Sequence, residues 1–253
     1  MIDAHAHLID SKIDAENIIN NMASDKLDMI INIGTCVKDS KKGVKLAAEN
    51  ENIYTTVGIH PEYASSVTEQ KLQTIDELAS RDKVVAIGEI GLDYHYEITE
   101  EIVEKQKQIF IEQIKIAHKH GLPVVIHCRD AADDVIKILK DNKQFLTNGF
   151  CMHCYSEGSR YYQTFKDMGS YFSFTGNITY KKTDRSYLKN LDKDKIMVET
   201  DSPYLAPEPL RGTINAPKNV WITAQKVADE LEMSLTDFNN LVTKNIKTFY
   251  RIK

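Results

Sequence analysis

The sequence has few of the features that mark membrane, disulfide-rich or disordered proteins. No apolar run approaches the 18 residues of a membrane-spanning helix, so no membrane partner is expected. Only four cysteines occur in 253 residues, and their spacing shows no disulfide framework. With six prolines and 27% charged residues, the composition argues against a disordered chain. The 42% of hydrophobic residues suffices to bury a sizeable core.

An excess of basic residues is also missing, since the formal net charge is -5. The chain therefore lacks the overall basic surface of many nucleic-acid-binding proteins. A nucleic-acid partner is not excluded, because bound divalent ions would place positive charge inside a site. The first residues, MIDAHAHLID, show no basic region followed by an apolar one, so no secretory signal and a cytoplasmic location are expected.

Short apolar segments alternate with longer amphipathic ones along the whole chain. The short ones are near-continuous apolar runs, which is typical of parallel strands buried on both faces. The eight predicted strands are Ile2–His5, Asp28–Ile33, Tyr54–Ile59, Val84–Glu89, Pro123–His127, Gly149–His153, Tyr171–Phe174 and Ile196–Thr200. This alternation predicts an α/β fold, a (β/α)8 TIM-type barrel formed by one domain over residues 1–253. A doubly wound open sheet has the same local pattern and stays as the alternative.

The helical patterns lie between the predicted strands. The clearest helix begins after Thr99, a good N-cap, and runs to about His120, before Gly121 and Pro123. The other predicted helices are Asp14–Ser24, Lys38–Asn50, Thr68–Ser80, Ala131–Asn142, Ser159–Met168, Ser186–Leu191, Lys218–Leu231 and Ser234–Tyr250.

Histidines and carboxylates cluster at the ends of the predicted strands. All parallel strands of a barrel end on the same face, so residues far apart in sequence can meet there. The candidate metal ligands are His5, His7, Glu89, His127, His153 and Asp201. Each alone has an ordinary explanation, such as a surface histidine or a turn-capping aspartate. Their common position predicts a metal centre.

Individual residue types indicate what each ligand could do. His5 and His7 are separated by one residue, so in a strand both point to one side and can grip one ion. Glu89 could bridge two ions, and Gly88 and Gly91 beside it suggest close backbone approach. Asp201 could contact one ion and take a proton from the attacking water.

Several neighbouring residues admit two interpretations. Glu199 has the same strand parity as Asp201 and is also a candidate, although Asp201 is nearer the expected mouth. Arg129 suits bidentate contact with phosphate or a surface salt bridge, and His60 at a third strand end is a candidate substrate contact. Cys151 and Cys154 form a C-x-x-C pair without a second such pair, so we interpret both as small apolar fillers.

These segments together resemble the TatD family of metal-dependent deoxyribonucleases, within the amidohydrolase-like superfamily. The matching segments are IDAHAHL, VGIHPE, AIGEIGLDYH, PVVIHCRDA, MHCYSE, ETDSPYLAP and RGTINAP. The resemblance implies a TIM-type barrel with two divalent ions. It implies that one ion is held by His5, His7 and Asp201, and the other by His127 and His153, with Glu89 bridging both. It further implies substrate contacts by His60, Arg129 and Arg211.

The hypothesis from these observations is a deoxyribonuclease that hydrolyses phosphodiester bonds with a water activated by two metals. Asp201 would be the general base and Glu89 the bridging catalytic residue. DNA, as single strands or ends, is the expected substrate. Tyrosines expected near the mouth could stack on a base, namely Tyr63, Tyr94, Tyr96 and Tyr204.

Two other functions compete with this hypothesis. The same activated water would serve an ester or amide hydrolase, such as a D-aminoacyl-tRNA deacylase. A non-enzymatic, metal-dependent scaffold or nucleic-acid binder is the third, against which the complete ligand set argues. Four imidazoles suit Zn, Mn, Fe or Ni better than Mg alone, so the identity of the metal stays open.

Overall fold

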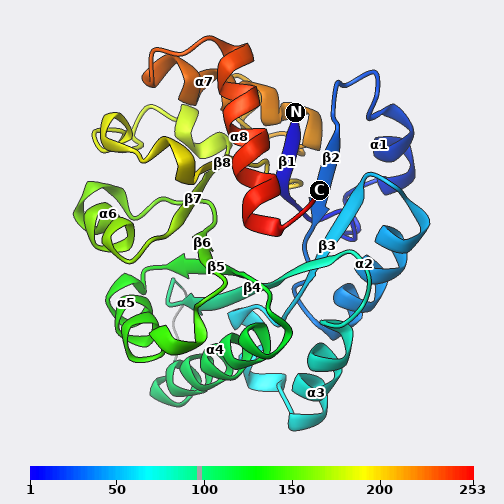
Figure 1. Ribbon diagram of the computed structural model, residues 1–253, viewed down its shortest axis with the longest axis vertical. Helices are drawn as coiled ribbons and strands as arrows, with labels where there is room; N and C mark the ends of the chain where they lie inside the picture. Colours follow the sequence, from blue (N-terminus) through cyan, green and yellow to red (C-terminus); the bar gives the residue numbers. More distant parts are fainter. Residues whose placement is uncertain (96–98) are drawn as a thin grey trace.

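Eight parallel strands, paired in the order in which they follow along the chain, form the centre of the structure (Figure 1). The computed structural model describes residues 1–95 and 99–253. The strands are β1 (Ile2–Ala6), β2 (Met29–Asn32), β3 (Ile53–Val57), β4 (Val84–Asp93), β5 (Val124–Arg129), β6 (Phe150–Met152), β7 (Tyr171–Phe174) and β8 (Ile196–Val198). The predicted (β/α)8 barrel is confirmed, and the open doubly wound sheet is wrong.

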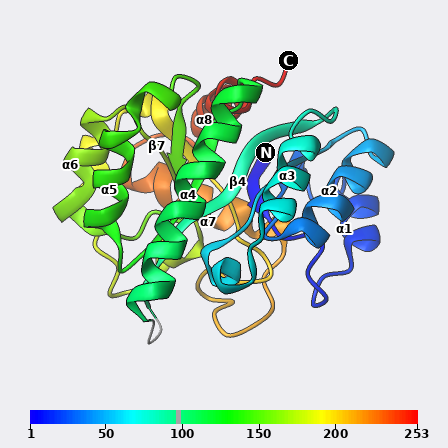
Figure 2. The same cartoon turned by 90° about the horizontal axis from the view of Figure 1, so that it is seen from below.

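Helices surround the strands, and Figure 2 shows α6, α5, α4, α3 and α2 following one another around the outside. Among the described residues, no helix is both long and apolar enough to cross a membrane. The α-helices are α1 (Ala15–Asn21), α2 (Val37–Glu49), α3 (Glu69–Leu78), α4 (Glu100–His120), α5 (Ala132–Asp141), α6 (Gly158–Asp167), α7 (Val220–Glu230) and α8 (Leu235–Tyr250). Short 3-10 turns are η1 (Pro61–Ser66), η2 (Lys143–Phe145), η3 (Gly176–Thr179), η4 (Leu188–Asn190), η5 (Lys193–Lys195) and η6 (Pro217–Asn219).

The predicted ends of the longest helix, α4, are confirmed. The side chain of Thr99 accepts a hydrogen bond from the backbone of Ile102, and Gly121 ends the helix at a left-handed φ of 68°. By contrast, the predicted helix Ser186–Leu191 is wrong, because only the short turn η4 forms there. Asp184 accepts hydrogen bonds from both the backbone and the side chain of Ser186, which favours a local turn over a helix.

Strands β4 and β5 extend further than predicted. Glu89 and His127 therefore lie inside their strands instead of at the ends, because the pairing continues to Asp93 and Arg129. Gly91 permits this extension: a Cβ atom at this position would lie 2.0 Å from the carbonyl oxygen of His127. The close backbone approach predicted at Gly91 is confirmed.

The barrel closes between its first and last strands. Beyond the end of β8, Ala6 and Ser202 form an isolated parallel bridge. Below it, the buried carboxyl group of Asp3 accepts hydrogen bonds from the backbone and side chain of Thr200, 2.9 and 2.5 Å long. On the outside of this seam, the hydroxyl of Tyr250 in α8 donates to the carbonyl of Ala4 at 3.0 Å. The seam matters for function because the segment that follows β1 and the segment that follows β8 carry site residues.

Candidate metal centre

All six predicted ligands converge at one mouth of the barrel, the one toward which the strands run. A cavity of about 520 Å³ opens there, lined by five of them, His7, Glu89, His127, His153 and Asp201. The sixth, His5, lies directly beneath and is fully buried. This is the face of a TIM barrel on which active sites are found.

One group of ligands, which we call site A, consists of His5, His7 and Asp201. The Nε2 atoms of His5 and His7 are 3.4 Å apart. Asp201 Oδ1 lies 3.4 Å from Nε2 of His5 and 3.0 Å from Nε2 of His7. The three donor atoms thus face a common point, as the ligands of one cation must.

A second group, site B, consists of His127 and His153. Nδ1 of His127 and Nε2 of His153 lie 3.4 Å apart, and both are directed at Glu89. In contrast to the histidines of site A, His127 presents its Nδ1 atom to the group.

Glu89 connects the two sites through its two carboxylate oxygens. Oε1 lies 2.7 Å from Nδ1 of His127 and 2.8 Å from Nε2 of His153. Oε2 lies 3.5 Å from Nε2 of His5 and 3.8 Å from Nε2 of His7. One oxygen therefore faces each site, which is the arrangement that a carboxylate bridging two ions requires.

The carboxylates and histidines of the two sites shift one another's pKa values. Burial acts to raise the pKa of Glu89, but the surrounding histidines, above all His153, hold it well below its ordinary value. Burial also opposes charge on His153, whereas Glu89 raises the pKa of this histidine well above its usual value. Burial would likewise raise the pKa of Asp201, but its hydrogen bond with His7 lowers it. Both carboxylates are thus ionised and available to cations, which would displace histidine protons.

Two further carboxylates, outside the six predicted ligands, contact the outer nitrogens of the site B histidines. Asp93 Oδ2 lies 3.0 Å from Nε2 of His127, and Glu199 Oε1 lies 3.2 Å from Nδ1 of His153. Such carboxylates orient metal-binding histidines and set which nitrogen carries the proton. Strand parity contained a signal for Asp93, because it lies four residues after Glu89 in β4.

The predicted substrate contacts fall in different places. His60 and Arg129 line the central cavity. Arg211 is exposed, lies 4.3 Å from the centre of the Tyr180 ring and is not among the residues that line the cavity. The predicted contact of Arg211 with substrate stays a prediction.

The tyrosines predicted to stack on a base also lie in different places. Tyr63 and Tyr204 line the cavity, with exposed fractions of 37% and 44%. Tyr94 instead lines a neighbouring hollow and donates a hydrogen bond to Asp134. Tyr96 lies outside the described residues.

The cysteines take no part in any group that could hold a metal ion among residues 1–95 and 99–253. Cys151 is buried in the core, as predicted for an apolar filler. Cys154 is half-buried, and its sulfur lies 3.3 Å from the hydroxyl oxygen of Thr175. The donors that sites A and B offer to a cation are therefore imidazoles and carboxylates, a set that fits borderline divalent ions.

Comparison with known proteins agrees with this geometry. The sequence profile of the TatD related DNases matches residues 2–251. The chain is 35% identical to the uncharacterized metal-dependent hydrolase YabD of Bacillus subtilis, covering 100% of this chain and 99% of that protein. It is 30% identical to the uncharacterized metal-dependent hydrolase YcfH of Escherichia coli, covering 100% and 96%.

Solved structures show the same fold. The TatD homologue YJJV of Escherichia coli superposes with a TM-score of 0.92 over 100% of this chain and 98% of its own, at 23% identity. A TatD family hydrolase of Entamoeba histolytica gives a TM-score of 0.86 over 99% and 97%, at 23% identity. With a matching profile over nearly its whole length and a cluster of histidines and carboxylates at the mouth of the barrel, the chain belongs to the TatD family of metal-dependent hydrolases.

Proposed function

We propose that this protein is a two-metal phosphodiesterase that cleaves DNA. The observation that carries the proposal is the position of Glu89, whose two carboxylate oxygens face separate groups of ligands. Two-metal phosphodiesterases hold their ions roughly 3.5–4 Å apart, a separation that one bridging carboxylate can span. His5, His7 and Asp201 would hold one ion, and His127 and His153 the other, with Glu89 shared.

The protein's own groups supply the positioning and the proton transfer. Two bound ions would acidify a water molecule and neutralise charge on a phosphodiester. Asp201 is ionised, so its carboxylate can accept the proton of the attacking water. Burial lowers the pKa of His60 to about 3, so this imidazole stays neutral. Its Nδ1 accepts a hydrogen bond from the backbone N–H of Glu62, so the proton lies on Nε2, which faces Oε1 of Glu89 at 3.5 Å and would donate to a phosphate oxygen bound beside that carboxylate.

The charge of the cavity makes substrate binding depend on the ions. Carboxylates of Asp10, Asp39, Glu62 and Asp93 line it in addition to the ligands, and Arg129 contributes a guanidinium among the described lining residues. An anionic phosphodiester would be repelled by these groups in the absence of metal. Two divalent ions would offset most of this negative charge and place positive charge at the point where the phosphodiester binds.

The size of the cavity favours an unpaired strand or a strand end. About 520 Å³ lies within the range of small-molecule sites, so the cavity accommodates a nucleotide but not a duplex. Tyr63 and Tyr204 on its walls offer ring faces on which an unstacked base can rest.

The direct test is hydrolysis of labelled single-stranded, blunt-ended and circular double-stranded DNA by the metal-free chain with added Mn²⁺, Mg²⁺ or Zn²⁺. We expect cleavage of the first two substrates only, and none with EDTA. Asp201→Asn should abolish turnover, by at least about 10³-fold, because the variant loses both a ligand and the proton acceptor.

A matched histidine variant controls for general damage. His120→Asn removes an imidazole at the end of α4 that contacts Asp76, and since neither residue is among those that line the cavity, cleavage should be unchanged. An aminoacyl ester assayed in parallel separates phosphodiester from carbonyl chemistry. Turnover of this ester alone, or cleavage of DNA that persists in EDTA and in Asp201→Asn, would contradict the proposal.

A further inference from the structure

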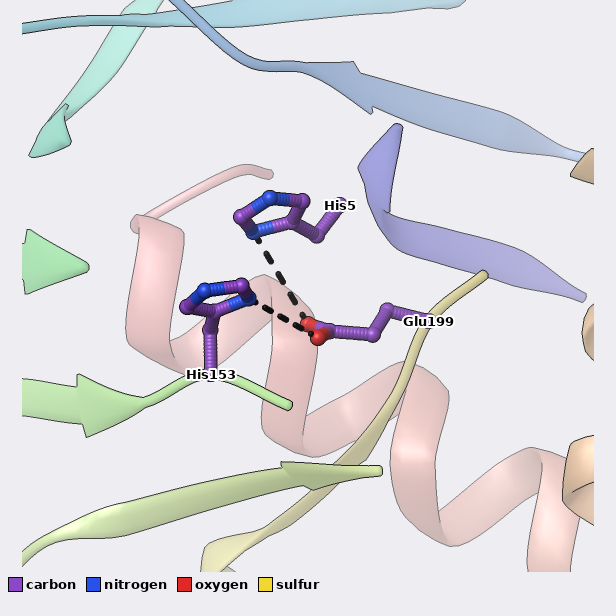
Figure 3. A group of neighbouring side chains, drawn as sticks. All are labelled: His5, His153 and Glu199. Carbon is purple, nitrogen blue, oxygen red and sulfur yellow. Dashed lines mark hydrogen bonds and ion pairs between the residues drawn. The ribbon is translucent and has the colours of Figure 1, made fainter. Parts of the chain in front are cut away.

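Beneath the two candidate ion sites lies a buried carboxylate that neither site requires as a ligand. Glu199 follows β8 and is only 1% exposed. Figure 3 shows its side chain directed at two imidazoles, one from each site. These are His5 of site A and His153 of site B, whose rings stack with centroids 4.1 Å apart and an interplanar angle of 9°.

The two oxygens of Glu199 have different surroundings. Oε1 accepts a hydrogen bond from the backbone N–H of Cys154 at 2.8 Å and lies 3.2 Å from Nδ1 of His153. Oε2 lies 4.0 Å from Nδ1 of His5. This Nδ1 atom is buried and makes no hydrogen bond in the structure, although a buried polar atom without a partner is costly.

The opposite nitrogens of both rings are directed at the ion sites. Nε2 of His5 faces Asp201, His7 and Glu89, and Nε2 of His153 faces Glu89. A neutral imidazole has one N–H and one lone pair. If Nε2 binds an ion, the proton of the imidazole must lie on Nδ1, and this N–H then needs a hydrogen-bond acceptor. Glu199 is the carboxylate next to the Nδ1 atoms of both histidines.

His5, His153 and Glu199 also satisfy the spacing of a metal-binding group. A third ion there would have to bind Nδ1 of both histidines, and each ring would then carry a metal at both nitrogens. Both rings would have to lose their last N–H proton, which raises the cost of this arrangement. The geometry therefore favours Glu199 as an acceptor of two N–H groups over Glu199 as a ligand.

We propose that Glu199 is a positioning residue shared by the two ion sites, which holds His5 and His153 in the form that binds metal through Nε2. The inference rests on the proposed two-ion centre. The hydrogen bond between Glu199 and His153 is already formed, whereas His5 must approach by about 1 Å to reach ordinary hydrogen-bond length. With Nε2 of His5 directed at an ion, its Nδ1–H would donate to Glu199, and one carboxylate would then link the two sites.

Glu199→Gln tests this inference because it keeps the size of the side chain but replaces one oxygen by an NH₂ group. The remaining oxygen keeps the hydrogen bonds from Cys154 and His153. The NH₂ group then faces Nδ1 of His5 and donates to it, which places the proton of His5 on Nε2 and removes the lone pair from site A. We expect site A to bind Zn²⁺ about 10–100-fold more weakly, and site B to change by less than about threefold.

Two measurements on the full-length chain give the result. Calorimetric titration of the metal-free protein with Zn²⁺ resolves the affinity of each site. Imidazole ¹⁵N chemical shifts report the position of each proton, and we expect His5 to change from Nδ1–H to Nε2–H in the zinc-bound variant. Tyr250→Phe is the control, since it removes a buried hydrogen bond to Ala4 beside His5: it should weaken site A by no more than a few-fold and leave both tautomers unchanged.

The outcomes that overturn the inference are distinct from failure of nuclease activity. Equal weakening of both sites, or unchanged affinity at site A with His5 still protonated at Nδ1, would overturn it. So would three zinc ions bound to the wild type and two to Glu199→Gln, which would make Glu199 a ligand. If the variant does not fold, the zinc-bound wild type decides instead, because Nε2–H on either histidine would also overturn the inference. A wild type that binds two ions but does not cleave DNA would contradict only the proposed function.

Discussion

Site A and site B use the same kinds of ligand but are built differently. Site B draws its ligands from the neighbouring β4, β5 and β6, and the outer nitrogen of each of its histidines has a carboxylate within 3.2 Å. Site A draws its ligands from the two sides of the barrel seam, 194 residues apart in sequence. One of its histidines, His5, has no hydrogen bond to its outer nitrogen.

The difference indicates how the two sites depend on the rest of the molecule. A ligand whose ring is already oriented loses little freedom when it binds an ion. The histidines of site B are therefore already oriented by the carboxylates at their outer nitrogens, and we expect site B to bind its ion first. Site A depends on closure of the barrel and on movement of His5, so we expect it to bind more weakly and exchange its ion faster.

The largest expected effect is a loss of zinc affinity at both sites, which removes the difference between site A and site B. Glu89→Gln replaces the carboxylate whose two oxygens face site A and site B, and it removes a negative charge from among four histidines. Zinc affinity should fall by more than about 100-fold at site A and at site B alike, which exceeds the usual effect of changing an outer carboxylate. Calorimetric titration checks this, and a variant that still fills one site normally would show that Glu89 does not bridge.

A smaller change should affect site B alone. Asp93→Asn removes the anionic partner of Nε2 of His127, so the orientation of this ring is no longer imposed. We expect the affinity of site B to fall by about 10–100-fold while the affinity of site A stays unchanged. The two sites would then fill together, or site A would fill first. Zinc titration measures both affinities, and equal losses would contradict the independence of the two sites.

The smallest effect concerns the seam. Thr200→Val removes a hydroxyl that donates to Asp3 and accepts from the backbone N–H of Ser202, both in the buried seam. We expect the free energy of unfolding to fall by about 1–3 kcal/mol. Site A should weaken by a few-fold and site B should not change, because only site A spans the seam. Denaturant unfolding and zinc titration measure the two effects, and weakening confined to site B would contradict the dependence of site A on the seam.

The sequence predicted the barrel because its strands are continuous apolar runs and its longest helix carries clear caps at Thr99 and Gly121. It also predicted which residue types would gather at the mouth, from their position near strand ends. It did not predict that β4 and β5 would continue past Glu89 and His127, because that extension depends on the fit between Gly91 and a carbonyl of the neighbouring strand.

Hydrophobic periodicity and residue chemistry are local properties, so the order of the buried strands and six candidate ligands could be predicted from the sequence alone. Three relations required the folded barrel: one oxygen of Glu89 faces each site, His127 presents Nδ1, and Glu199 faces two histidines whose rings stack on each other. These are relations between side chains brought together by barrel closure. Their distances depend on how eight strands pack, which no single segment encodes.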